Sequence, residues 1–157
     1  LVIFSAAIGI VLMIALAVAY LVPTVSGAPF RALAPFAELA EDIGDLGFAD
    51  GIILAQDFYI GGNLKLHLPE AAVAETEYGL STLPADHQAT PVVVVWSGRR
   101  ERPPKGLRTL FEALCGSTAP LDEATSTRFT ERYQHGSRAK YTLTVVKVDS
   151  CPAAGHP

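Results

Sequence analysis

The hydrophobic pattern divides the chain into two parts. Residues 1–22 carry no charge, and only Ser5 and Gly9 interrupt their apolar run. A helix of this length would measure about 33 Å, which matches a hydrocarbon core of about 30 Å. The run therefore predicts a transmembrane helix that ends before Pro23, because the proline ring removes a backbone donor.

Two alternatives stay open for this run. One is a cleaved signal peptide, because Ser26-Gly27-Ala28 has the small residues of a cleavage site. Against it, the run is longer than a signal core of roughly 7–15 residues, and no basic residue precedes it. The other alternative is a buried helix of a soluble core. The chain starts at Leu1 rather than Met, so we expect it to be a fragment of a longer protein.

After a linker at residues 23–30, helical and strand spacing of apolar residues alternate. Helical spacing predicts helices over residues 33–46, 58–67 and 105–114. Asp57 is a suitable N-cap for the second of these. Short apolar or alternating runs predict strands over residues 51–55, 71–78, 91–96, 127–134 and 139–148.

This order of elements predicts the fold class. Strands that alternate with helices are typical of an α/β domain with a partly parallel sheet. The last two runs predict a β-hairpin that turns at Gln134-His135-Gly136-Ser137, with an irregularity near Val146. We therefore expect a small α/β domain with a mixed sheet over residues 31–150, followed by a tail at residues 151–157.

Charge narrows the class of partner. The formal net charge is −4, which argues against a nucleic-acid-binding protein. Arg31 is the only basic residue in the forty or so residues after the apolar run, where six acidic residues lie. Cytoplasmic flanks of membrane spans carry an excess of Lys and Arg. The sequence therefore predicts an extracytoplasmic (periplasmic) domain at the inner membrane, with the lipid bilayer as a partner.

Known catalytic patterns are absent from the sequence. It contains no GxxxxGK[ST] phosphate loop, no GxGxxG and no GxSxG elbow. The four histidines are scattered without metal-ligand spacing. Gly61-Gly62 falls inside a predicted helix, where close packing on a sheet explains it better than phosphate binding. We therefore predict no catalytic residue, metal or cofactor in this chain.

One basic cluster follows the predicted strand at residues 91–96. It consists of Arg99, Arg100, Arg102 and Lys105. Open α/β sheets place ligand crevices at the carboxyl ends of their strands, so the cluster is a candidate for binding an anionic lipid headgroup or a lipid-linked phosphate. The alternative interpretation is a solvated loop without a ligand.

The two cysteines, Cys115 and Cys151, lie at the ends of predicted elements, 36 residues apart. In an oxidising compartment they are candidates for one disulfide. Two free thiols are the alternative.

The stretch Ala49-Asp50-Gly51-Ile52-Ile53-Leu54-Ala55-Gln56-Asp57-Phe58-Tyr59-Ile60-Gly61-Gly62-Asn63-Leu64-Lys65-Leu66-His67-Leu68-Pro69 carries a resemblance. It resembles the extracytoplasmic C-terminal region of bacterial polytopic glycosyltransferases. These are related to dolichyl-phosphate-mannose protein mannosyltransferases and the lipid A aminoarabinose transferase (glycosyltransferase family 39). The strand from Val92 to Trp96 and the tyrosine-led strand from Tyr141 to Val148 follow in the same order.

The resemblance implies an integral membrane enzyme that uses a polyprenyl-phosphate-linked sugar as donor and an envelope molecule as acceptor. Its catalytic acidic residues would lie in an early extracytoplasmic loop, so none is carried over to this chain, and the fragment alone is expected to be inactive. Two other hypotheses remain. One is a single-span, membrane-anchored α/β binding or interaction module, and the other is a secreted enzyme released by signal cleavage.

Overall fold

The computed structural model describes residues 8–18, 34–83, 91–133 and 139–151. The chain divides into two compact units, each taken by itself below. One comprises residues 1–35 with 132–141, and the other comprises residues 36–131 with 142–157. The domain boundaries predicted at residues 23 and 31 lie outside the described residues, as do the tail at residues 152–157 and the turn at residues 134–137.

The N-terminal apolar run forms a helix over residues 8–18, with exposed side chains. Among the described residues, no helix has both the length and the apolar character needed to cross a membrane. The prediction of a transmembrane helix over residues 1–22 is therefore wrong. The remaining residues of that run lie outside the described ranges.

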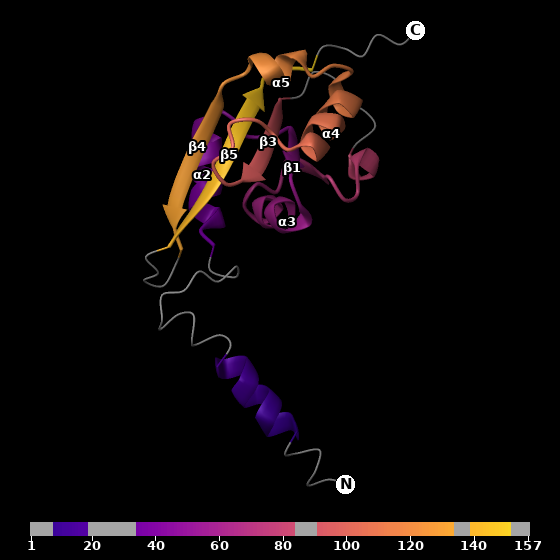
Figure 1. Cartoon of the computed structure of the whole chain (residues 1–157). Coiled ribbons are helices and arrows are strands. Elements are labelled where there is room, and N and C mark those ends of the chain that lie inside the picture. The colour runs from indigo at the N-terminus through magenta and orange to yellow at the C-terminus, as the bar shows by residue number, and fades with distance from the viewer. Residues whose placement is uncertain (1–7, 19–33, 84–90, 134–138, 152–157) are drawn as a thin grey trace. The chain divides into compact units, whose positions relative to one another are not determined.

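A mixed five-stranded sheet forms the centre of the larger unit, as Figure 1 shows. The strand order is β2-β1-β3-β5-β4. β1 is parallel to β2 and β3, and β3 is antiparallel to β5. The strand bounds are Ile52–Ala55 (β1), Ala72–Glu75 (β2), Val92–Ser97 (β3), Ser126–Arg132 (β4) and Lys140–Val148 (β5). The predicted α/β architecture with a mixed sheet is present. Below, the carboxyl edge is the side where β1, β2 and β3 end, and the amino edge is the side where they begin.

Helices cover both faces of this sheet. The bounds of the longer helices are Phe36–Asp45 (α2), Phe58–His67 (α3) and Lys105–Cys115 (α4). Two short helices, Leu80–Thr82 (η2) and Ala119–Glu123 (α5), were not predicted. Buried residues of α4 and α5 pack on alternate side chains of β1, β3 and β5, such as Leu54, Trp96 and Val146. α3 packs on β2 and beside α2, on the opposite face.

Both faces of β5 are buried in its central part, which corrects one detail of the prediction. Its pairing with β3 is regular from Val92↔Val148 to Ser97↔Leu143, with no irregularity at Val146. Val145 and Val146 are both buried because β5 lies between β3 and β4 and has helices on either side. Consecutive apolar residues in such a strand reflect burial on two faces rather than a bulge.

Gly61 shows why α3 approaches the sheet closely. A Cβ at this position would lie 2.6 Å from Oε1 of Glu75 and 2.9 Å from Cγ1 of Val73, both on β2. Gly62 has no atom within 4 Å of such a Cβ. Close packing of the helix on the sheet therefore accounts for Gly61. At the start of α3, Asp57 accepts a hydrogen bond of 3.0 Å from the backbone N–H of Ile60. Asp57 therefore caps the helix, as its position in the sequence predicts.

Candidate functional site

Side chains of the sheet hold the backbone of the loop between β3 and α4, residues 98–104, in place. Three successive carbonyls, at residues 98–100, accept hydrogen bonds from side chains of the sheet. The donors are the hydroxyl of Thr144 (2.7 Å), the guanidinium of Arg128 (3.0 Å) and the indole N–H of Trp96 (2.9 Å). These bonds fix the course of the loop while the basic side chains of residues 99, 100 and 102 stay exposed.

The structure divides the predicted basic cluster into two pairs. Arg102 and Lys105 line a cleft of about 580 Å³. Arg99 and Arg100 lie on the same loop but are not part of the cleft lining. All four residues are exposed. We call the three arginines of the loop together with Lys105, the first residue of α4, the cationic loop; only its second half, Arg102 and Lys105, faces a cavity.

The cleft lies where the loop, α4, α5 and β5 meet. Its floor includes Val146 of β5, and α5 and the residue after it form one wall. The residues of the lining are Glu101, Arg102, Pro103, Lys105, Arg108, Leu121, Asp122, Ala124 and Val146. Three cations and two carboxylates therefore surround an opening with a small apolar floor.

An ion pair spans the cleft lining from α4 to α5. Arg108 forms two hydrogen bonds to the carboxylate of Asp122, one of them 3.1 Å from Nη2 to Oδ2. The hydroxyl of Thr118 donates a further bond of 3.1 Å to Oδ2. The side chains of the pair are 34% and 46% exposed, so solvent screens the interaction.

Electrostatics at this pair favour the ionised carboxylate. The hydrogen bond from Arg108 is the largest cause of a lowered pKa of Asp122, and Thr118 acts in the same direction. The positive charge of Arg102 also lowers this pKa, so Arg102 lies within electrostatic range of the carboxylate. The ionised Asp122 therefore places a negative charge among the cations that line the cleft.

The sequence did not identify Arg108 and Asp122 as site residues. Arg108 lies three positions after Lys105 on α4, a spacing that places both on one helix face. From that spacing the sequence could have indicated that Arg108 belongs to the basic cluster. No comparable signal identifies Asp122, since it lies on a helix of five residues that the pattern does not predict.

The expected ligand crevice at the carboxyl edge is bridged by a side chain. The chain runs from β1 toward β2 and from β3 toward β4, so the connections leave these two neighbouring strands in opposite directions. Open α/β sheets bind ligands in the crevice between two such strands, at their carboxyl ends. There Oε1 of Gln56 accepts hydrogen bonds from the backbone N–H (3.2 Å) and hydroxyl (3.4 Å) of Ser97. Gln56 also accepts a bond of 2.6 Å from Thr76 through its carbonyl. The cleft beside α4 is therefore displaced from the crevice position that the general rule predicts.

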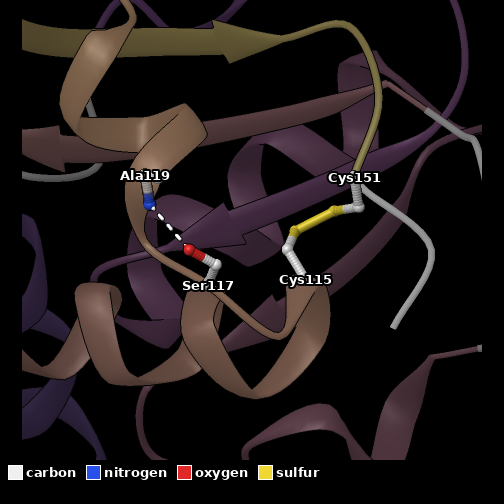
Figure 2. Close-up of a disulfide and its surroundings, with 4 residues drawn as sticks. All are labelled: Cys115, Ser117, Ala119 and Cys151. Atoms are coloured by element: carbon white, nitrogen blue, oxygen red, sulfur yellow. Dashed lines mark hydrogen bonds between the residues drawn. A yellow bond between two sulfur atoms is a disulfide. The ribbon is translucent and has the colours of Figure 1, made fainter. Parts of the chain in front are cut away.

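Cys115 and Cys151 form a disulfide with a Cα–Cα distance of 4.9 Å, shown in Figure 2. It links the C-terminal end of α4 to the chain that follows β5 at the amino edge. Nearby, the hydroxyl of Ser117 accepts a hydrogen bond of 3.1 Å from the backbone N–H of Ala119 at the start of α5 (Figure 2). The disulfide thus fixes one end of α4, while the other end lines the cleft.

Carboxylates also gather at the carboxyl edge near α3. Partial burial is the main cause of a raised pKa of Glu75, and the charges of Glu77 and Asp57 add to it. In the part of the chain that the structure describes, no group of three or more His, Cys, Asp or Glu residues is placed to hold a metal ion. These carboxylates therefore supply charge but no metal-binding geometry.

Comparison with known proteins gives one partial match. The chain is 36% identical over 50 residues to the lipopolysaccharide core galacturonosyltransferase RgtA of Rhizobium johnstonii. The match covers 31% of this chain and 10% of that protein, so the chain corresponds to a small part of its relative. No family model matches the chain, and no solved structure matches it. Part of this chain is thus similar to a glycosyltransferase, and the sequence resemblance is confirmed at that level.

Proposed function

We propose that this chain is a domain of an envelope glycosyltransferase that takes a sugar from a polyprenyl-phosphate donor. The cationic loop contributes Arg99, Arg100, Arg102 and Lys105 to hold the phosphate of that donor. The similarity to RgtA carries the reaction class, because RgtA is a galacturonosyltransferase of the lipopolysaccharide core. The finer assignments, namely the donor and an acceptor in the cell envelope, rest on the family resemblance and on the charge of the loop.

The chemistry of the loop supports a phosphate ligand. Arginine presents planar paired donors to phosphate oxygens, and lysine adds a compact positive charge. The formal net charge of the whole chain is −4, so the positive charge of this loop differs in sign from the net charge of the chain. Basic residues near an anionic lipid surface contribute about 1 kcal/mol each. The loop is therefore suited to the anionic part of a lipid-linked donor.

The disulfide supports an extracytoplasmic site of action. Disulfides persist in oxidising compartments such as the bacterial periplasm and are rare in the cytosol. We place this domain at the outer face of the inner membrane, where it would meet a lipid-linked donor. The catalytic carboxylates that the family resemblance implies would be supplied by other parts of the enzyme.

Paired substitutions in the full-length enzyme test this function. Arg102→Gln with Lys105→Gln, and Arg99→Gln with Arg100→Gln, should each raise the KM for the lipid-linked donor several-fold and flatten its salt dependence. The kcat should change little, since these residues bind rather than react. Arg132→Gln with Lys140→Gln, at the end of β4 and the start of β5, is the control with the same loss of charge. If both loop pairs behave like this control, the loop has no role in donor binding, and the domain is better described as an interaction module.

A further inference from the structure

The cleft beside α4 has more cations than the basic loop alone provides. Arg108 lies on its lining with Arg102 and Lys105, but its guanidinium is occupied by Asp122. A second carboxylate, Glu101, is also part of the lining and is exposed. The charge available to a ligand in this cleft therefore depends on which anion Arg108 binds.

The pairing of Arg108 with Asp122 is suited to exchange. Bidentate arginine–carboxylate and arginine–phosphate pairs use the same two parallel N–H donors. Both side chains are at least one-third exposed, so no burial prevents the carboxylate from separating. The hydroxyl of Thr118 also donates to this carboxylate, in a bond that does not involve Arg108.

A phosphoryl group would gain contacts that the carboxylate lacks. A phosphate monoester, such as the polyprenyl phosphate left after transfer, carries a charge of about −1.5 to −2 near neutral pH and three acceptor oxygens, whereas the sugar-linked diester of the donor has a single negative charge. The carboxylate of Asp122 is hydrogen-bonded to Arg108 and Thr118, while Arg102 acts on it only through its charge. A phosphoryl group between the side chains of the lining has acceptors for Arg102 and Lys105 as well as for Arg108.

The start of α4 provides further donors at the same place. Its N-cap is Pro104, which makes no side-chain capping hydrogen bond. The first turn of a helix has backbone N–H groups without intrahelical partners, and these favour phosphate. Pro103 and Lys105, on either side of the cap, both line the cleft.

We propose that this cleft binds a phosphoryl group through Arg102, Lys105 and Arg108, and that Asp122 occupies Arg108 until the phosphoryl group displaces it. Asp122 is thus a built-in competitor that lowers the affinity of the cleft for a phosphoryl group. The inference rests on the proposed function, in which the loop holds the phosphate of a donor. It extends that function to Arg108, which raises the affinity for phosphate, and to Asp122, which lowers it.

Titration of the full chain in neutral detergent with inorganic pyrophosphate, by calorimetry at low and physiological salt, tests the exchange. Asp122→Asn should raise the affinity several-fold, because it removes the carboxylate that competes for the guanidinium of Arg108. Glu123→Gln is the matched control, since it removes the same charge from the next residue of α5, which is not in the lining. Arg108→Gln should lower the affinity and abolish the gain from Asp122→Asn in the double variant.

The outcomes separate this inference from the proposed function. If Asp122→Asn and Glu123→Gln behave alike while Arg102→Gln with Lys105→Gln loses binding, the phosphate contact stands and the exchange is overturned. If no variant binds pyrophosphate, the same series with phosphatidylcholine vesicles, with and without polyprenyl phosphate, decides whether only a lipid phosphate binds. Absence of binding in both assays overturns the site, whatever the transfer kinetics show. Should Asp122→Asn fail to fold, Asp122→Ala removes the same competing carboxylate and should give the same gain.

Discussion

The amino and carboxyl edges of the sheet share backbone hydrogen bonds, such as Gln56 N–H to the carbonyl of Val95 (3.0 Å) at the carboxyl edge, but differ in the links that are added to them. At the amino edge, backbone bonds join Ile52 N–H to the carbonyl of Pro91 (2.9 Å) and Ala72 N–H to that of Gly51 (2.8 Å). The disulfide adds a covalent link there. At the carboxyl edge, side chains such as Gln56 and Thr144 bond the backbone of the loops. One edge thus contains a covalent link that does not depend on surface charge, while the other contains exposed cations.

The largest expected effect comes from opening the disulfide at the amino edge. Replacing Cys115 and Cys151 by alanine should lower the free energy of unfolding by about 3–4 kcal/mol, since the closed loop spans 36 residues. Urea denaturation of the oxidised chain and of the double variant measures this. A loss below about 1 kcal/mol would mean that the amino edge does not depend on the covalent link.

A smaller effect is expected from a buried hydrogen bond at the carboxyl edge. Thr144 is fully buried and donates to the carbonyl of Gly98. Thr144→Val keeps the shape of the side chain but leaves that carbonyl without its donor, and should cost about 1–3 kcal/mol. The control is Thr130→Val, whose hydroxyl forms a partly buried hydrogen bond with that of Thr142 rather than with a loop carbonyl. Equal urea midpoints for the two variants would show that the loop is not held by this bond.

A pH-dependent effect is expected at Glu75. Burial raises the pKa of this carboxyl in the folded chain, so protonation favours folding. Its contribution is complete below the ordinary glutamate pKa and is lost as the pH rises through the raised value. Glu75→Gln should therefore stabilise the chain slightly at pH 7, with the gain disappearing near pH 4. Identical thermal melts of Glu75→Gln and the wild type at both pH values would contradict the prediction.

The smallest effect on stability is expected at the cations themselves. Arg102→Gln with Lys105→Gln should change the free energy of unfolding by no more than about 0.5 kcal/mol, because both side chains are exposed. Binding of phosphate should fall in the same variant. A large loss of stability would mean that the carboxyl edge depends on these charges, and would remove the contrast between the two edges.

Local patterns predict most of the elements of this fold. The N-cap at Asp57 and the proline after His67 delimit α3, whose observed bounds match the prediction. The apolar run from Val92 predicts β3 to within a residue. The short helix α5 was missed, because five residues give no helical period and Pro120 resembles a loop signal.

The site is predicted only in part for a different reason. A run of basic residues is visible in the sequence, so Arg102 and Lys105 could be identified from it. The pair of Arg108 and Asp122 joins residues 14 positions apart across two helices. That contact depends on how α5 folds back beside α4, which no local spacing specifies. The Gln56 bridge to Ser97, 41 residues away, has the same origin.

The three anchored carbonyls at residues 98–100 have a consequence for the entropy of binding. A flexible loop loses conformational freedom when it closes on a ligand, about 1–2 kcal/mol for each backbone residue that becomes ordered. Here the donors Thr144, Arg128 and Trp96 already order the backbone in the free chain. Binding then restricts mainly the side chains of the cations. The loop is therefore preorganised, and differences in affinity among anions should reflect their charge and shape rather than the ordering of the backbone.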